Sequence, residues 1–216
     1  MAGRPRKKDV ESWGRERLLA AAARLFAAKG YAATSVRDIL GAAKVTAPVL
    51  YYHFGSKEGL FVGLLREGLE TLEAEVKKAL GEATGAADKV SAYCRVHLIV
   101  QRRFADHRRI AEGLIAGPPK AAPSFDIKGT FARMVRQLAD LVGAAVESGE
   151  FRPCDPTTAA LALLGAVEMT VRARLIEGRF PVLADADDGV LAFVLDGLRA
   201  GSSPSPRTRA GSKSIG

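Results

Sequence analysis

The chain has 216 residues, of which 48% are hydrophobic and 26% charged, with a formal net charge of +8. Its length allows one large domain or two small ones, and its composition is ordinary for a globular protein. No apolar run is long enough to span a membrane, and no signal-peptide pattern follows the basic N-terminus. We therefore expect a cytoplasmic protein without a membrane partner, in which Cys94 and Cys154 are free thiols.

The positive charge is concentrated at the two ends of the chain. Residues 1–60 hold 11 Lys and Arg against 5 Asp and Glu, whereas residues 61–199 hold 18 against 19. A basic segment beside a neutral body indicates a nucleic-acid-binding module. A merely solvated basic surface explains the charge alone equally well.

Both ends lack the periodicity of regular structure. Residues 1–11 are charged and contain Gly and Pro, so we expect a flexible basic arm, which either contacts DNA or only keeps the protein soluble. Residues 200–216 combine Ser, Pro and Gly with basic residues, and we expect them to form a disordered tail.

Every segment between these ends has the character of a helix. Ala and Leu dominate the apolar residues, and no segment alternates with a period of two, so the predicted fold class is all-α. Four helices are expected in the N-terminal part, at about 12–29, 34–43, 46–53 and 56–80. Five more are expected at about 87–105, 107–116, 124–148, 156–178 and 187–199.

Local signals set the starts of the short helices. Thr34 or Ser35 is the expected N-cap of the second helix, and Ser56 that of the fourth. Thr46 is the expected N-cap of the third helix, with Pro48 in its first turn, where the missing N–H costs nothing. Two short helices joined by a tight turn and backed by a longer first helix form a helix-turn-helix unit.

The start of the third helix has the residues that a DNA-reading helix needs. Thr46, Ala47, Pro48 and Val49 are small, so they fit the end of a helix that enters the major groove. The threonine hydroxyl can hydrogen-bond a phosphate or a base edge, and the methyl groups of Ala47 and Val49 can pack on a thymine methyl. These four residues are therefore predicted to contact DNA.

Hydrogen-bonding groups follow directly. Tyr51, Tyr52 and His53 are expected on the solvent side of the third helix, where their O–H and N–H groups suit phosphate oxygens. Lys57 lies in the first turn of the next helix, where a cation opposes the helix dipole. A phosphate bound at that helix end would explain a lysine there, so Lys57 is also predicted to contact DNA.

The run "TSVRDILGAAKVTAPVLYYHFGSKEGLF" resembles the DNA-binding domain of the TetR family of bacterial transcriptional regulators. Residues 34–39 match the start of the family's second helix, and Val45 and Thr46 match its turn. Residues 50–54 with 56–58 match its most characteristic signature. The resemblance covers about residues 12–62 and adds Thr34, Ser35 and Arg37 to the expected DNA contacts.

The resemblance implies the organisation of the whole chain. We expect a DNA-binding domain over 12–58 and a helical domain over 59–199 that binds a small molecule and forms a homodimer. The helices at about 156–178 and 187–199 would build the dimer interface. The expected function is that of a repressor, which binds a palindromic double-stranded operator and is released by an effector of unknown identity. An activator of the same fold, and a ligand-binding protein with no DNA role, remain open alternatives.

One residue departs from the family pattern. Lys44 stands in the turn where the family usually has Gly. A positive φ at this position would cost a side chain about 1 kcal/mol.

Other candidate sites in the sequence are weak. Cys94 and His97 share a helix face, but two ligands do not make a metal site, and we predict neither a metal nor a cofactor. No catalytic motif is present, so no enzyme is predicted. Glu168, Arg172 and Arg174 interrupt an apolar helix, where they either line a ligand cavity or, as the preferred interpretation, form ion pairs at the dimer interface.

Overall fold

The computed structural model describes residues 7–116, 122–175 and 187–201. Within these ranges every regular element is an α-helix, apart from an isolated β-bridge between Phe151 and Arg199. The all-α prediction is confirmed. The helices are α1 (Lys7–Lys29), α2 (Val36–Ala43), α3 (Ala47–Phe54), α4 (Lys57–Glu82), α5 (Ala86–Arg103), α6 (Ala105–Ala116), α7 (Ile127–Glu147), α8 (Pro156–Leu175) and α9 (Asp187–Leu198).

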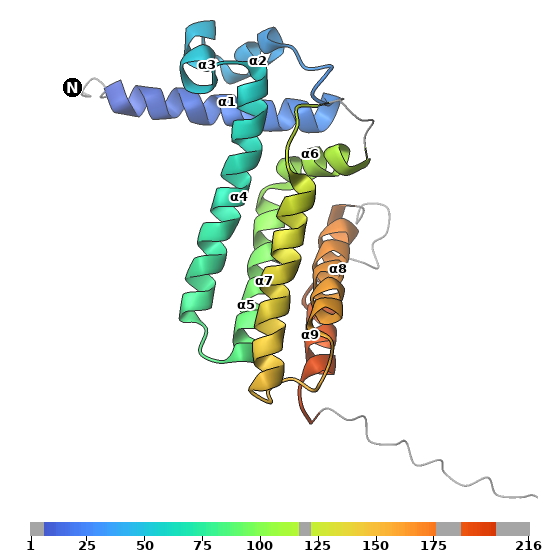
Figure 1. The fold of residues 1–216 in the computed structure, drawn as a ribbon. Coiled ribbons are helices and arrows are strands. Elements are labelled where there is room, and N and C mark those ends of the chain that lie inside the picture. Colours follow the sequence, from blue (N-terminus) through green and yellow to red (C-terminus); the bar gives the residue numbers. More distant parts are fainter. Residues whose placement is uncertain (1–6, 117–121, 176–186, 202–216) are drawn as a thin grey trace, which may run out of the picture.

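Helices α1, α2 and α3 and the first turns of α4 form one end of the molecule, which we call the head (Figure 1). Its core is an apolar cluster in which α1 supplies Leu18, Ala22 and Phe26, and the later helices supply Ile39, Leu50, Leu60 and Phe61. Because α2 and α3 are only 8 residues each, they are too short to be stable alone. Packing on α1 and α4 therefore holds them in place.

The turn between α2 and α3 has the left-handed residue whose cost the sequence analysis considered. Lys44 adopts φ 53° and ψ 46°, and its N–H donates to the carbonyl of Leu40 at the end of α2. No other non-glycine residue in the described ranges has a positive φ. The left-handed residue ends α2 and turns the chain into α3, at the cost of about 1 kcal/mol expected for a side chain in this region.

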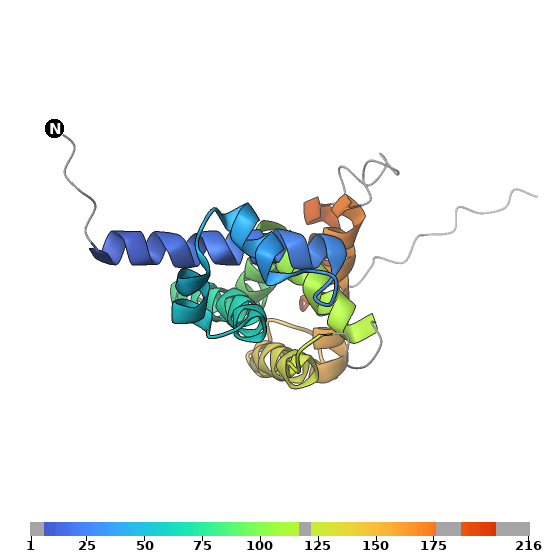
Figure 2. The ribbon, with the colours of Figure 1, turned by 90° about the horizontal axis from the view of Figure 1, so that it is seen from above.

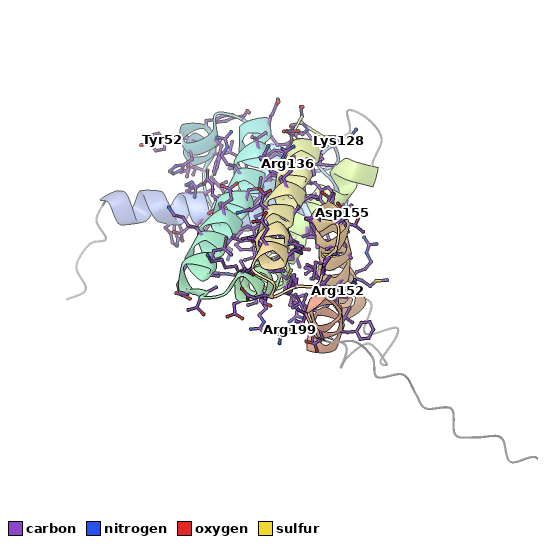
Figure 3. All side chains as sticks on the ribbon, turned by 60° about the horizontal axis from the view of Figure 1, so that its bottom comes forward. Tyr52, Lys128, Arg136, Arg152, Asp155 and Arg199 are labelled. Atoms are coloured by element: carbon purple, nitrogen blue, oxygen red, sulfur yellow. The ribbon has the colours of Figure 1, made fainter. Side chains whose placement is uncertain are left out.

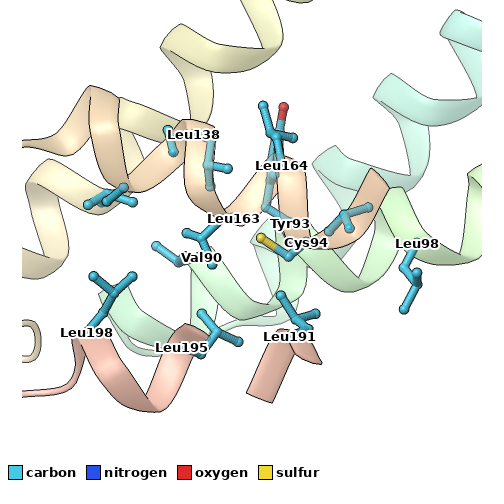
Figure 4. Packing of buried hydrophobic residues seen from close by; sticks show 14 of the residues in the cluster. Val90, Tyr93, Cys94, Leu98, Leu138, Leu163, Leu164, Leu191, Leu195 and Leu198 are labelled. Atoms are coloured by element: carbon cyan, nitrogen blue, oxygen red, sulfur yellow. The ribbon is translucent and has the colours of Figure 1, made fainter. Parts of the chain in front are cut away.

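The remaining helices form a second layer, the body, with a core of its own. Tyr93 and Cys94 of α5 are fully buried at its centre, against Leu138 of α7, Leu163 of α8 and Leu195 of α9 (Figure 4). None of the helices in the described ranges is long and apolar enough to cross a membrane.

Two helices belong to both parts of the molecule. The first half of α4 buries Leu60 and Leu64 in the head, and its second half buries Leu72 and Val76 in the body. Helix α6 follows the body helix α5, yet its Ile110 is buried in the head core. Seen along the orthogonal direction, α1 lies over the start of α6, whereas α7 lies clear of it (Figure 2). Helices α4 and α6 thus connect the head to the body.

The first helix is longer than the sequence predicted. It begins at Lys7, so residues 7–11 of the expected flexible arm are helical, which is a correction. The reason is local, since no Gly or Pro interrupts residues 7–13 and several of them favour helices. Residues 1–6, the tail from 202 onward, and residues 176–178 of the predicted eighth helix lie outside the described residues.

The junction between α3 and α4 tests how tightly the head is packed. A Cβ added at Gly59 would lie 2.0 Å from the carbonyl oxygen of Phe54. We expect Gly59→Ala to lower the free energy of unfolding by about 1–3 kcal/mol, because the backbone must move to relieve the clash. Gly81→Ala, in the same helix with no atom within 4 Å of the added Cβ, should leave stability unchanged or raise it by up to about 1 kcal/mol. Urea unfolding of both variants measures the difference, and equal stabilities would contradict this packing.

Candidate nucleic-acid interface and the neighbouring cavity

Helix α3 is anchored by one face and open on the other. Leu50 is fully buried, and Val49 packs its Cγ1 so close to α1 that a Cβ added at Gly14 would lie 2.8 Å from it. Thr46, Pro48, Tyr51 and Tyr52 are exposed, whereas Ala47, Val49 and His53 are half-buried. The structure therefore brings the predicted contacts of α3 together at one surface, although the methyl groups of Val49 also pack on α1.

The start of α3 leaves a hydroxyl group unused. Thr46 is the N-cap residue by its backbone conformation, with φ −90° and ψ 159°, but its side chain makes no capping hydrogen bond. The carbonyl of Thr46 instead accepts the N–H of Val49 at 3.1 Å, and Pro48 has no N–H to satisfy. The hydroxyl of Thr46 therefore remains available to a ligand.

Two aromatic hydroxyl groups project from the outer face of α3. Tyr51 is 54% and Tyr52 72% exposed, and Tyr52 lies at the outer corner of the molecule, far from the labelled body residues (Figure 3). The ring of His53 packs edge-on against that of Tyr52, with centroids 4.9 Å apart. A tyrosine hydroxyl can donate a hydrogen bond, so two exposed ones in succession can bind acceptor oxygens. This face is suited to a polar, anionic surface such as a phosphate backbone.

Ser35 caps α2, the helix that precedes α3, and Arg37 lies in its first turn. The hydroxyl oxygen of Ser35 accepts the N–H of Asp38, and the Asp38 carboxylate accepts the N–H of Ser35, both at 3.1 Å. These hydrogen bonds hold the pKa of Asp38 below its usual value. Of the two predicted caps, Ser35 is the one that forms. Its hydroxyl proton and the exposed Arg37 remain free to contact a ligand.

The side chain of Thr34, a predicted DNA contact, points into the protein. Thr34 is 1% exposed, and its hydroxyl faces the carbonyl oxygens of Gly30, at 2.8 Å, and Leu25, at 3.3 Å. It closes the C-terminal end of α1, where carbonyl groups lack helical partners.

Lys57 has a structural role that the sequence analysis missed. Its Nζ donates to the carbonyl oxygens of Tyr31 and Thr34, both at 2.9 Å, and lies 4.0 Å from the centre of the Tyr31 ring. The lysine thus ties the start of α4 to the loop between α1 and α2. One ammonium proton remains for a phosphate, so the contact with DNA stays a prediction.

A cavity of about 570 Å³ lies in the body, below the head, between α4, α5, α6, α7 and α8. Its walls are mostly apolar and include Leu69, Phe104, Phe131, Met134 and Leu164. A second cavity of about 540 Å³ adjoins it and shares Leu69, Leu72, His97, Thr130 and Met134. This size and lining are typical of a small-molecule site.

Burial shifts the pKa values of His97 and Cys94. Burial lowers the pKa of His97 to about 4 and raises that of Cys94 to about 12, so at neutral pH the imidazole is uncharged and the thiol protonated. The His97 ring packs on that of Tyr93, with centroids 4.4 Å apart. Among the described residues, no group of three or more His, Cys, Asp or Glu could hold a metal ion.

Glu168 and Arg172 lie at the cavity wall, together with Arg108 and Glu112 of α6. Arg172 pairs with both glutamates at 3.3 Å, within the same chain. The structure thus places Glu168 and Arg172 in the wall of a cavity, which was the first of the two alternatives for these residues. The side chain of Arg174 lies outside the described residues.

Comparison with known proteins matches both parts of the molecule. A sequence model described as "Bacterial regulatory proteins, tetR family" matches residues 18–64, from α1 into α4. The HTH-type transcriptional repressor KstR2 of Mycolicibacterium smegmatis is 31% identical over 143 residues, which cover 64% of this chain and 68% of that protein. The HTH-type transcriptional activator FasR of the same organism is 28% identical over 168 residues, which cover 67% and 77% of the two proteins.

A solved structure shows the same fold. The TetR family transcriptional regulator PfmR from Thermus thermophilus superposes with a TM-score of 0.66 and 26% identity, over 88% of this chain and 98% of that one. The similarity therefore extends over the head and the body.

The Lys57 contacts lead to a stability prediction. Lys57→Met keeps the aliphatic stem but leaves the carbonyls of Tyr31 and Thr34 without their donor, so we expect a loss of about 1–3 kcal/mol in the free energy of unfolding. Lys78→Met, at an exposed position of the same helix, should change stability by less than about 0.5 kcal/mol. Denaturant unfolding compares the two, and an unchanged midpoint for Lys57→Met would show that this lysine does not hold the head together.

Proposed function

Because this chain belongs to the TetR family of bacterial regulatory proteins, we propose that it is a ligand-responsive, DNA-binding transcriptional regulator that acts as a repressor in the cytoplasm. A homodimer occupies a palindromic operator and leaves it when a small molecule binds the body. The observation that carries this proposal is α3, which presents an unused threonine hydroxyl and two exposed tyrosines on one face of a basic head. We assign no catalytic residue and no cofactor.

Helix α3 is the reading element in this proposal. Its narrow N-terminal end, with Thr46, Ala47 and Pro48, enters the major groove and contacts base edges. Tyr51, Tyr52 and His53 bind phosphate oxygens beside the groove. Ser35 and Arg37 contact the backbone from α2. The exposures of these residues support that division of roles.

Dimerisation is proposed through α8 and α9. Phe193 is 81% and Met169 62% exposed in the single chain, and Val190 is also exposed beside Phe193 on α9. Apolar side chains of this size on two neighbouring helices support a protein interface. Two-fold symmetry then presents two copies of α3 to a palindromic operator.

The response to ligand is proposed to pass through α6. One side of α6 contributes Ile110 to the head core, and another contributes His107 and Ala111 to the cavity wall. A ligand that prefers one position of α6 would therefore shift the head relative to the body. The effect requires different affinities for the two conformers, since equal affinities shift nothing.

Activation of transcription is the second candidate. The similarity to the activator FasR favours it, and the same contacts with DNA would serve either role. A reporter gene under the bound promoter separates the two, because deleting a repressor raises expression and deleting an activator lowers it.

The role of Tyr52 can be measured directly. Tyr52→Phe removes one hydroxyl, and we expect affinity to fall about tenfold for operator and for unrelated DNA alike, because a phosphate contact carries no sequence information. Tyr93→Phe removes a hydroxyl that donates to the carbonyl of Met134 inside the body and should leave DNA affinity unchanged. Gel-shift titrations at fixed salt report both values. A change in base preference for Tyr52→Phe would contradict the phosphate role.

The dimer interface offers a second measurement. We expect Phe193→Glu to give monomers in analytical ultracentrifugation, because a buried carboxylate without a partner is costly in an apolar interface. Ile99→Glu, at a similarly exposed apolar residue on α5, should leave the dimer intact. Dimers that persist in Phe193→Glu would exclude α9 from the interface.

A further inference from the structure

One arginine in the cavity wall has more donors than the chain satisfies. The side chain of Arg108 on α6 is only 8% exposed, and its Nη2 donates to Oε1 of Glu112 and, at 3.0 Å, to Oε1 of Glu168. Its Nε and Nη1 are buried and have no hydrogen-bond partner. Buried charged donors without acceptors cost free energy, and in native proteins they usually have a partner.

The surroundings define the missing partner. A guanidinium is a donor only, so the partner must offer an oxygen acceptor. The cavity also contains Gln101, Thr130 and two histidines, but none of its side chains bonds Nε or Nη1 of Arg108. Most of the remaining lining is apolar, with side chains such as Leu69, Phe104 and Phe131. The acceptor therefore belongs to a molecule whose remaining surface is apolar.

The charges around Arg108 allow a carboxylate to enter. Arg108 and Arg172 are balanced by Glu112 and Glu168, so the cluster has no net charge. The side chains of Glu112 and Glu168 are 38% and 43% exposed, so either can turn into water when displaced. Arg108 has no such freedom, because it is buried. A planar carboxylate offers a guanidinium two well-placed oxygens.

The length of the space favours an elongated molecule. The two cavities adjoin through shared walls, and His97 lines both of them. His97 is 2% exposed, is uncharged at neutral pH, and makes no hydrogen bond within the described part of the chain. An uncharged chain can therefore run past His97 while its acidic end stays at Arg108.

We propose that this cavity binds an elongated apolar acid whose carboxylate is held by Arg108 in place of Glu112 or Glu168. The inference rests on the proposed function in taking the cavity as the effector site. Because Glu168 is on α8 and Arg108 is on α6, displacing this glutamate removes the Arg108–Glu168 ion pair between these helices and leaves the pair of Arg172 with Glu112. Ile110 of α6 is buried in the head core, so this ion pair links ligand chemistry to the position of the head.

The test uses the full-length protein and three probes of equal chain length: dodecanoate, 1-dodecanol and dodecyltrimethylammonium. Calorimetric titration below the micellar concentrations should show dodecanoate binding at least tenfold more tightly than the other two. Equal or tighter binding of the alcohol or the ammonium compound, or no binding of dodecanoate, would overturn the proposal. This comparison needs no variant, so it decides even where substitutions impair folding.

Variants then locate the carboxylate. Arg108→Gln should weaken the binding of dodecanoate at least tenfold and leave the binding of 1-dodecanol unchanged. Arg108→Lys keeps the positive charge but not the paired N–H donors of the guanidinium, so it should recover part of the affinity for dodecanoate. Arg109→Gln, on the same helix with its side chain 53% exposed, should bind like the parent. Undiminished dodecanoate binding by Arg108→Gln would place the acid elsewhere and refute the assignment.

A parallel gel-shift assay with operator DNA keeps the two proposals apart. Operator binding that dodecanoate does not affect, together with no dodecanoate binding, refutes the acid site and leaves the regulator intact. Dodecanoate binding through Arg108 in a protein that binds no DNA supports the site and refutes the proposed function. Release of the operator by dodecanoate, lost in Arg108→Gln, supports both.

Discussion

The structure depends on how α3 is held. An 8-residue helix is not stable by its own hydrogen bonds. In the proposed function its outer face stays free for DNA, so only its inner face can pack against the protein. Close packing of α1 and α4 against its inner face fixes the position of α3. Gly14 lets α1 come against Val49, Gly59 lets α4 begin against the carbonyl of Phe54, and Leu50 is sealed between them. A short helix clamped in this way can present its residues in a fixed geometry, which is what base recognition requires.

The same packing joins the head to the sensor. Helix α4 buries residues in both cores, and α6 buries Ile110 in the head core while His107 and Ala111 line the cavity of the body, so neither part can shift without disturbing the other. Packed interfaces of this kind have discrete arrangements rather than continuous ones. The ion pairs between α6 and α8 are the polar counterpart of this coupling, and they lie at the cavity wall where a ligand can reach them.

Local signals in the sequence were sufficient for the helices and for most of α3. Local signals predict Ser56 as a cap and Ser35 as one of two candidate caps, and both form caps in the structure. The place of Lys44 in the turn came from the resemblance to the TetR family. The structural roles that the sequence did not indicate depend on the fold. Lys57 bonds carbonyls 23 and 26 residues earlier, and the hydroxyl of Thr34 turns inward to carbonyls 4 and 9 residues earlier, at the end of α1. Arg108 meets Glu168 across 60 residues, a pairing that appears only when the fold is known.

Cys94 has a consequence for how the body can be observed. Its thiol is fully buried at the centre of the body core, and burial raises its pKa to about 12. In the native state the sulfur is therefore both inaccessible to electrophiles and protonated, so it does not react with them. Alkylation of this sulfur must wait for the helices around it to separate. The rate at which the folded protein takes up a thiol reagent at this position therefore reports opening of the body core, without any engineered substitution.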